Sequence, residues 1–272
     1  MNKISLAGDL GSGKSTVAKI LIEALGAEYY STGSIVRGIA ERMGMTIGEL
    51  NVYMETHPEI DNEVDNGLVA LAHDPRSLII DSRMAWHFTE GTFKVYLSTD
   101  LETAACRIWN AGRTCEHAKT LEETVRHTAE RRASEKKRYA EQYGVDITDL
   151  SNYSLVVDTT YATPEEIAGV ILSCFEQWRL DPNSRFCYLS PERLNYIDDE
   201  HDAELTTELS ARLERAETIP SVTVFEQDGE FYVKDGLESA LAYSFNFYTL
   251  VPTTLVKGDV GDRKYVKMKN SL

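Results

Sequence analysis

The sequence predicts an α/β fold in which a parallel sheet carries helices on both faces, followed by a small C-terminal α+β domain. Four short apolar runs, at residues 4–7, 77–81, 93–97 and 154–158, are typical of buried strands. Long helical patterns separate these runs, and strands that alternate with helices favour a parallel sheet. Beyond residue 185 the expected elements become short and mixed, which indicates a second domain.

A glycine-rich loop joins the first expected strand to a helical pattern over residues 15–25. The residues from Gly8 to Ser15 read GDLGSGKS and fit G-x-x-x-x-G-K-S, the P-loop pattern. Glycines let successive N–H groups point at an anion, and the helix N-terminus adds partial positive charge. We expect Lys14 to reach the β- and γ-phosphates and the Ser15 hydroxyl to bind Mg²⁺. The predicted phosphate-binding residues are Gly8, Gly11, Ser12, Gly13, Lys14, Ser15 and Thr16.

The first domain is expected to end with a helix that begins near Thr163. The sequence TPEE over residues 163–166 offers an N-cap, a proline at the first helical position and two acids in the first turn. The helical pattern continues to about Trp178, and residues 180–185, LDPNSR, have the composition of a linker. We therefore predict domains over residues 1–179 and 185–272.

The second domain is expected to combine helices with a hairpin. Ser190-Pro191-Glu192 would start a short helix, and residues 203–216 form a longer amphipathic pattern. Residues 222–225 and 231–233 read as the two strands of a hairpin, because the Asp228-Gly229 pair favours the positive φ angles of a tight turn. A helix over 237–243 and a strand over 253–256 complete the prediction.

Composition excludes several classes of function. The chain has 28 lysines and arginines against 44 acids, a net charge of −16, whereas a general nucleic-acid binder needs a basic surface. It carries no apolar run of membrane-spanning length and no secretory signal, so we expect a cytoplasmic protein without membrane association. No C-x-x-C pair is present, so reduced thiols are expected rather than a zinc site. The four cysteines are Cys106, Cys115, Cys174 and Cys187.

Arginines form the second set of candidate phosphate ligands. Arg83 follows the end of the expected strand at 77–81, and ligands of parallel sheets bind at the carboxyl ends of strands. That place would put Arg83 away from the P-loop, on the side of an acceptor. Other arginines occupy a helical stretch rich in both charges, where the alternative is a solvated face with i,i+4 ion pairs. Phosphoryl transfer uses such cations because negative charge spreads over the transferred group in the transition state.

Seven segments of the first domain follow one another in a recognisable order. They are 8–16, 30–37 (YSTGSIVR), 45–51 (MTIGELN), 58–65 (PEIDNEVD), 82–86 (SRMAW), 134–139 (SEKKRY) and 143–151 (YGVDITDLS). Over about residues 1–175 they resemble the cytidylate kinases, most closely the short archaeal-type branch. The resemblance implies a P-loop nucleoside monophosphate kinase that uses ATP and Mg²⁺.

The resemblance also implies roles for individual residues. Ser31, Gly33 and Arg37 would hold the acceptor monophosphate, and Arg83 would bind its phosphate or the transferred group. The arginines implied to close over the donor phosphates are Arg107, Arg113, Arg131 and Arg138, of which Arg131 and Arg138, with Lys14 and Arg83, form the expected catalytic set.

Three acids have two interpretations each. Asp61 and Asp65 would lie on the helix that covers the acceptor base, or on an exposed acidic face. Asp81 would hold the water shell of Mg²⁺, or would simply end a strand.

This chain departs from the family pattern at two places. Ser82 stands where the family usually has glycine, a change that is tolerated if φ stays negative. The residues after Arg113, CEHAK at 115–119, have no match. Either departure would alter acceptor choice or activity.

The second domain resembles ParB/sulfiredoxin-like domains over about residues 185–257. The similarity rests on YLSPE at 188–192, IPSVTV at 219–224, DGEFYVKDG at 228–236, ALA at 240–242 and VPTTLV at 251–256. Active members place histidine and arginine after the glycine to hold phosphates, whereas this chain has Leu237-Glu238-Ser239. Glu238 would repel a phosphate, so a relic or an interaction module is expected, with a protein partner or self-association as its open roles.

The function that these features favour is ATP-dependent phosphorylation of a nucleoside monophosphate, with CMP or dCMP as acceptor. A kinase for another small acceptor is the alternative on the same scaffold. A nucleotide-binding regulator whose second domain binds a partner is the alternative from another class. The arginine count favours the enzyme, and the appended domain favours the regulator.

Overall fold

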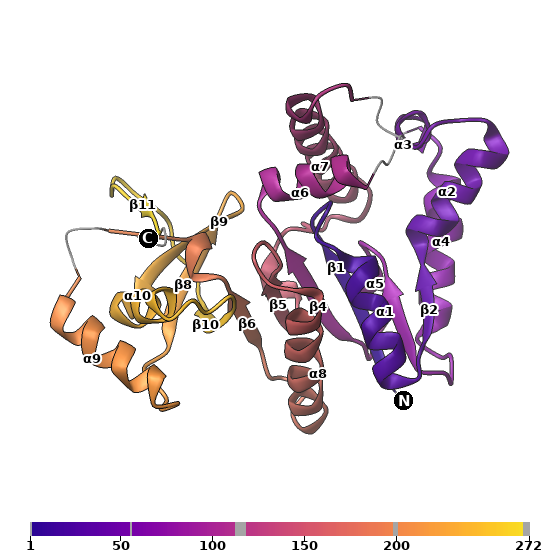
Figure 1. The fold of residues 1–272 in the computed structure, drawn as a ribbon. Helices are drawn as coiled ribbons and strands as arrows, with labels where there is room; N and C mark the ends of the chain where they lie inside the picture. Colours follow the sequence, from indigo (N-terminus) through magenta and orange to yellow (C-terminus); the bar gives the residue numbers. More distant parts are fainter. Residues whose placement is uncertain (1, 55, 112–117, 198–200, 269–272) are drawn as a thin grey trace. The chain divides into compact units, whose positions relative to one another are not determined.

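The computed structural model describes the chain except for residues 1, 55, 112–117, 198–200 and 269–272. The chain forms two compact units (Figure 1). The first comprises Met1–Leu155 and Pro164–Ser184, and the second comprises Val156–Thr163 and Arg185–Leu272. The division into domains over residues 1–179 and 185–272 remains our proposal. Residues 156–163, which lie within the first of these ranges, group with the second unit.

A parallel four-stranded arrangement forms the centre of the first unit. Its strands, in spatial order, are β4 (Phe93–Ser98), β1 (Lys3–Gly8), β3 (Leu78–Asp81) and β2 (Glu28–Ser31). Ile4 of β1 pairs with Ile79 of β3, and Leu6 of β1 pairs with Val95 of β4. These side chains are fully buried, as expected for strands covered on both faces.

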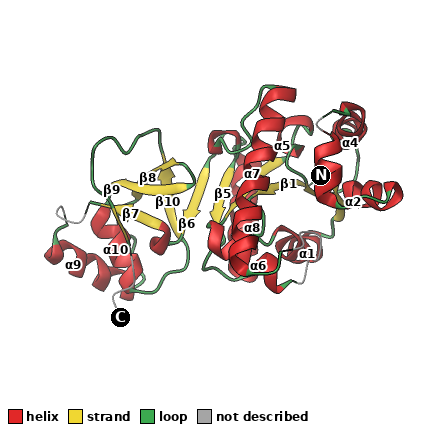
Figure 2. Ribbon diagram, turned by 90° about the horizontal axis from the view of Figure 1, so that it is seen from above, coloured by secondary structure: helices red, strands yellow, loops and turns green. Residues whose placement is uncertain are grey.

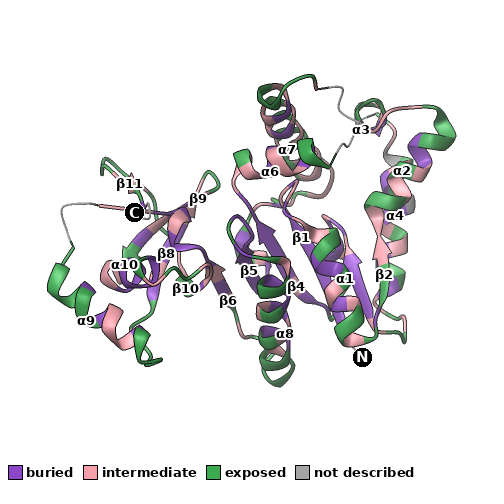
Figure 3. Cartoon of the chain, in the orientation of Figure 1, coloured by how far each residue is buried: buried purple, intermediate pink, exposed green. Residues whose placement is uncertain are grey.

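Helices cover both faces of this sheet, as the fold class predicts. Figure 2 shows α1 and α5 on opposite sides of β1. In Figure 3 the central strands β1, β3 and β4 are mostly buried, and exposed residues lie on the outer sides of the helices. The helices are α1 (Lys14–Leu25), α2 (Thr32–Met43), α3 (Ile47–Met54), α4 (Pro58–Leu71), α5 (Ala85–Phe88), α6 (Leu101–Asn110), α7 (Leu121–Tyr143), the 3₁₀ turn η2 (Leu150–Asn152) and α8 (Pro164–Leu180).

Strand β2 was missed by the sequence analysis. It pairs in parallel with β3, with Tyr30 opposite Ile80, and it lies at the edge of the sheet. Glu28 and Tyr29 are exposed and Tyr30 is half-buried, so this strand carries no apolar run of the kind that marks the central strands. Edge position explains why the apolar pattern is absent.

The second unit combines a mixed sheet with three helical elements. Its strands lie in the order β11 (Val266–Lys267), β7 (Leu194–Tyr196), β9 (Glu230–Asp235), β8 (Val222–Gln227), β10 (Val251–Leu255), β6 (Phe186–Leu189) and β5 (Leu155–Asp158). The helical elements are η3 (Pro191–Arg193), α9 (Ala203–Glu214) and α10 (Leu237–Phe245). The small α+β character predicted for this region is confirmed.

The predicted hairpin is present as β8 and β9, which pair antiparallel. Asp228 and Gly229 have φ angles of 55° and 83°, the positive values that their sequence favours. Three short strands, β6, β7 and β11, were missed. Every second residue of β6 is buried, but all four residues (FCYL) are apolar. The sequence therefore does not show the alternation of polar and apolar residues that indicates a half-buried strand. The short helix expected from Ser190 is the 3₁₀ turn η3.

The described residues contain no helix long and apolar enough to cross a membrane. Three of the four cysteines lie among them, and none of Cys106, Cys174 and Cys187 forms a disulfide within that part of the chain. Cys115 lies outside the described residues.

Candidate active site

The P-loop connects the end of β1 to the start of α1, and its glycines are required by close packing. A Cβ on Gly8 would collide with the backbone of Leu97, and a Cβ on Gly11 would collide with the backbone of Ala104. Both residues have positive φ, as does Gly13 at the N-cap of α1. The loop therefore needs glycine at Gly8 and Gly11 for space as well as for conformation.

Lys14 bends back over this loop. Its Nζ donates to the carbonyl oxygens of Gly8 and Asp9 at 3.1 and 2.8 Å, and to the Ser12 hydroxyl at 3.3 Å. Burial and the nearby Arg83 lower the pKa of Lys14 to about 7, against the opposing effect of neighbouring carboxylates. A bound polyphosphate would place negative charge next to the Lys14 ammonium group, whose hydrogen-bond partners in the free protein are neutral oxygens.

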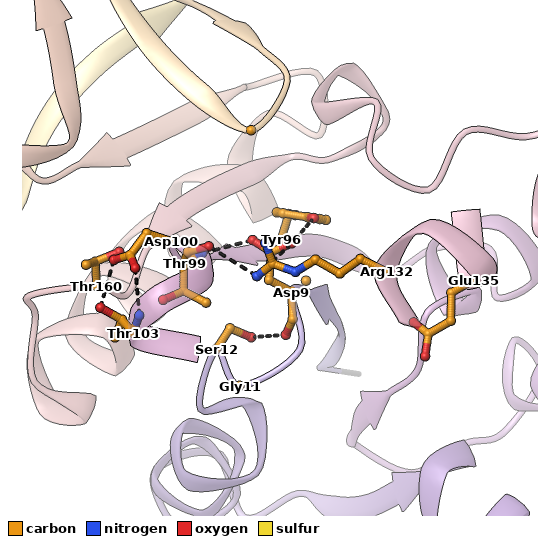
Figure 4. Close-up of polar contacts among 12 residues, drawn as sticks. Asp9, Gly11, Ser12, Tyr96, Thr99, Asp100, Thr103, Arg132, Glu135 and Thr160 are labelled. Atoms are coloured by element: carbon orange, nitrogen blue, oxygen red, sulfur yellow. Dashed lines mark hydrogen bonds and ion pairs between the residues drawn. The ribbon is translucent and has the colours of Figure 1, made fainter. Parts of the chain in front are cut away.

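Asp9 anchors the P-loop to two other elements. Its carboxylate accepts from the Tyr96 hydroxyl at 3.0 Å and from the backbone N–H of Thr99 at 2.9 Å. Arg132 of α7 lies 3.7 Å from the same carboxylate and donates to the Thr99 carbonyl at 3.3 Å (Figure 4). Asp9 and Arg132 therefore link the phosphate loop to α7, a link that the sequence analysis did not identify.

Arg83 reaches the P-loop, which corrects the expectation that it lies away from it. Its guanidinium donates to the Gly8 carbonyl and forms an ion pair with Glu135 at 2.7 Å. Glu135 also pairs with Arg131 at 3.0 Å, so one carboxylate binds both arginines. Burial alone would raise the pKa of Glu135, but Arg83 and Arg131 outweigh it and hold that pKa at about 2.

Helix α7 has two different charged faces. Ion pairs Arg126–Glu130 and Lys137–Glu141 are exposed, as the alternative of a solvated face predicts. Residues 131, 135 and 138 share another face at helical spacing, and there Glu135 and Arg138 are largely buried. The periodicity of α7 could have separated these faces, but only the tertiary structure shows which one turns inward.

Arg138 lies against α4 instead of the P-loop. It pairs with Asp61 at 3.3 Å and donates to the Tyr139 hydroxyl at 3.3 Å. Asp61 is 6 % exposed, so the alternative of an exposed acidic face does not hold for it. Asp65 accepts a hydrogen bond from Tyr143. Burial raises the pKa of both acids, against the lowering effect of Arg138 on Asp61 and of the Tyr143 hydrogen bond on Asp65.

The expected acceptor residues lie where β2 gives way to α2. Ser31 is the N-cap of α2, and its hydroxyl accepts from the backbone N–H of Ser34 at 3.3 Å. Arg37, one turn further, donates to the Ser34 hydroxyl at 3.0 Å. A Cβ on Gly33 would lie 3.5 Å from the guanidinium of Arg37, an ordinary van der Waals contact, so the fold itself leaves room for a side chain at this position. The structure thus gathers Ser31, Gly33 and Arg37 at one helix N-terminus.

Ser15 and Asp81 are the expected oxygen ligands of Mg²⁺. Ser15 is exposed in the first turn of α1, and Asp81 ends β3 with one carboxylate oxygen accepting from Tyr29 at 2.8 Å. Asp81 is close enough to raise the pKa of Lys14. Mg²⁺ prefers one or two protein oxygens together with water and substrate phosphates, so these residues fit the ion.

The remaining expected phosphate ligands are distributed as follows. Arg107 of α6 lies 3.5 Å from the Gly11 carbonyl, beside the loop. Ser12 is buried and donates to the Asp9 carbonyl at 2.8 Å, whereas Thr16 is exposed at the start of α1. Arg113 and most of the unmatched segment at 115–119 lie outside the described residues.

Ser82 has no positive φ and its hydroxyl accepts from the N–H of Met84, so serine fits where the family has glycine.

In the second unit, Glu238 follows the Gly236-Leu237 turn, where the sequence analysis expected a phosphate to be repelled. It lies in the first turn of α10 and accepts from the backbone N–H of Asp202 at 3.2 Å. A carboxylate at this helix N-terminus occupies the position that favours anions.

Comparison with known proteins places the first unit in a family. Residues 3–161 match the model of the cytidylate kinase-like family. The cytidylate kinase of Thermoplasma volcanium is 37 % identical over 187 residues, which cover 67 % of this chain and 93 % of that protein. The cytidylate kinase of Methanosarcina mazei is 36 % identical over 160 residues, covering 58 % of this chain and 87 % of that one.

A longer relative contains the same region. An S-adenosylmethionine-dependent nucleotide dehydratase of Lacinutrix mariniflava is 36 % identical over 176 residues, 64 % of this chain but 36 % of that protein. Among solved structures, shikimate kinase from Bacteroides thetaiotaomicron superposes with a TM-score of 0.47 at 16 % identity, covering 64 % of this chain and 98 % of that one. The match to this family shows that the chain is a phosphotransferase. The chain belongs to the cytidylate kinase-like family.

Proposed function

We propose that this chain transfers the γ-phosphoryl group of ATP to the phosphate of CMP or dCMP. Activity on nucleoside monophosphates is supported by the family and by relatives that are cytidylate kinases. Cytosine as the preferred base is our proposal, made by analogy with those relatives.

One observation carries the proposal. Lys14 and Arg83 both bind the carbonyl of Gly8, and Glu135 holds Arg131 next to Arg83. Lys14, Arg83 and Arg131 thus lie close together beside the P-loop, although they are far apart in the sequence. A site of this kind suits a transferred phosphoryl group, whose equatorial oxygens carry spread negative charge.

The reaction needs no protein nucleophile. An oxygen of the acceptor phosphate attacks the γ-phosphorus, a new P–O bond forms, the bond to the β-phosphate oxygen breaks, and ADP leaves with that electron pair. Catalysis then consists of positioning and charge neutralisation. Lys14 would bind the donor phosphates, and Arg83 would bridge the donor and acceptor phosphates from its place beside Gly8.

Glu135 has a specific part in this scheme. In the free protein its carboxylate neutralises Arg83 and Arg131, so a phosphate that binds them must compete with it. Arg138, Asp61 and Asp65 lie further along α7 and α4, where they would contact the acceptor nucleoside. Mg²⁺, held by Ser15 and Asp81, would neutralise charge on the donor phosphates.

The test is a coupled assay of ADP release with each ribo- and deoxyribonucleoside monophosphate as acceptor. We expect the highest kcat/KM with CMP or dCMP, and Lys14→Ala as control should show none of the activity. Rapid turnover of a different monophosphate would reject the cytosine preference alone. ATP binding without turnover of any monophosphate would reject the proposed function and favour a regulator or another acceptor.

A further inference from the structure

Residues 156–163 join the two parts of the chain. They lie almost entirely within the family match, which ends at residue 161, but they group with the second unit. The segment contains the end of β5 and the loop into α8, and it continues at both ends into the first unit, at Leu155 and Pro164. Groups outside the family match therefore contact this segment.

Arg193 is the main such group. Its side chain is 1 % exposed and pairs with Asp158 at 3.3 Å. It also donates to the Thr160 hydroxyl at 3.0 Å and to the Gly229 carbonyl in the β8–β9 turn at 3.0 Å. The guanidinium lies 5.6 Å from the ring centroid of Phe231. Arg193 thus fastens the end of β5 to the hairpin of the second unit.

Asp158 is enclosed from the other side as well. It is fully buried and accepts from the N–H and hydroxyl of Thr160 at 3.2 and 2.7 Å, and from the N–H of Ser190 at 3.4 Å. Burial raises the pKa of Asp158, and Arg193 opposes that shift. Removing the guanidinium would leave a buried carboxylate without its counter-ion, which is strongly unfavourable.

Stability alone does not account for this ion pair. Within the described part of the chain, the Nε of Arg193 is buried without a hydrogen-bond partner. A buried pair with an unsatisfied donor stabilises a fold no better than well-packed apolar side chains do. What the pair provides is a single conformation for residues 158–160, because each partner has a fixed set of contacts.

Helix α8 connects this segment to the helix that follows the P-loop. The loop that Arg193 fixes leads directly into α8 at Pro164, and α8 packs against α1 within the first unit. Helix α1 begins at Lys14, whose ammonium group donates to two carbonyl oxygens of the P-loop. In addition, segments beyond the carboxyl ends of parallel strands are where α/β folds bind ligands. Movement of residues 158–163 would thus shift the start of α8 and the donor site.

We propose that Arg193 is a positioning residue for phosphoryl transfer. By fixing residues 158–163 it sets the start of α8, so use of ATP by the first unit depends on the folded second unit. This inference rests on the proposed kinase function. It makes the second unit part of the enzyme's machinery, a role beyond that of a relic or an independent interaction module.

The test compares Arg193→Met with Arg215→Met in the full-length chain. Arg215 is an exposed arginine of the same unit that pairs with Glu217, so its variant is the matched control. We expect Arg193→Met to raise KM for ATP about tenfold. We also expect hydrogen exchange in residues 156–163 to become faster, with both quantities unchanged in Arg215→Met. A purely structural role would lower the folded fraction, and hence the maximal rate, without changing KM.

Thr160→Val provides a second variant that leaves no charge unpaired. It removes the hydroxyl between Asp158 and Arg193, and we expect a smaller rise in KM for ATP with the same local loss of protection. Wild-type KM in both Arg193→Met and Thr160→Val would overturn the inference while the kinase function stands. If Arg193→Met does not fold, the KM of Thr160→Val decides. An inactive wild-type chain would instead reject the proposed function, and this inference with it.

Discussion

The carboxylate of Glu135 lies 2.7 Å from the guanidinium of Arg83, which also donates to the Gly8 carbonyl of the P-loop. The same carboxylate binds Arg131 at 3.0 Å. The free protein thus supplies an internal anion to two arginines that we propose as ligands of the substrate phosphates.

Replacing Glu135 with glutamine should destabilise the folded protein by about 3 kcal/mol, because two arginines would lose their counter-ion in a largely buried site. Urea unfolding at neutral pH measures this difference, and Glu141→Gln, on the exposed face of α7, is the matched control. Equal unfolding free energies in the Glu135 variant and the wild type would show that the ion pairs contribute nothing.

The contribution of Glu135 should also depend on pH with a defined sign. Its pKa is about 2 in the folded chain, against 4.5 as the ordinary value. The stabilisation is therefore present above pH 4.5 and is lost as the pH falls toward 2, where the folded-state carboxylate takes up a proton. The difference between wild type and Glu135→Gln should shrink over that range, and a difference independent of pH would contradict the assignment.

Lys14→Met should stabilise the nucleotide-free protein while abolishing phosphoryl transfer. The pKa of Lys14 is about 7 when folded and 10.5 ordinarily, so below pH 7 the buried charge disfavours folding. As the pH rises from 7 to 10.5 the unfolded chain binds more protons than the folded one, and wild-type stability increases. Thermal unfolding should show a higher Tm for the variant at pH 6, on the scale of roughly 3 °C per kcal/mol, and a smaller difference at pH 10.

Arg83→Ala should lower kcat and raise KM for both ATP and the acceptor. The structure places Arg83 against the Gly8 carbonyl as well as at the end of β3, so it is shared between the two expected phosphate sites. Steady-state kinetics with each substrate varied in turn separates the two values of KM. A change confined to the acceptor would mean that Arg83 leaves the P-loop when substrates bind.

Arg138→Ala should raise KM for CMP and leave KM for ATP near its wild-type value. Arg138 pairs with Asp61 on α4, and no contact with the P-loop is observed for it among the described residues. The same kinetic experiment tests this, with Arg126→Ala as an exposed control on α7. A larger effect on ATP than on CMP would place Arg138 on the donor side, as the resemblance implied.

The sequence predicted the parts of the fold that depend on local pattern. The P-loop, the buried central strands and the Asp228-Gly229 hairpin follow from apolar periodicity and turn chemistry, and all are present. Strand β2 was missed because an edge strand with exposed residues has no apolar run, and β6 because all of its residues are apolar.

The contacts of the site depend on tertiary packing. Nothing local to residues 131–138 shows that Glu135 turns inward while Glu130 and Glu141 stay exposed. The ion pair of Asp9 with Arg132 joins residues more than a hundred positions apart, and that of Asp158 with Arg193 joins two parts of the second unit that are 35 positions apart in the sequence. Long-range ion pairs of this kind have no signature in a single sequence.

The most direct test of the central claim follows the transferred phosphorus itself. The wild-type chain is incubated with Mg²⁺, CMP and ATP labelled in the γ-phosphate, and the products are separated. We expect the label to appear in the β-phosphate of CDP, with ADP formed in equal amount and no CDP from Lys14→Met. Label released only as inorganic phosphate, or CDP formed equally well by Lys14→Met, would contradict it.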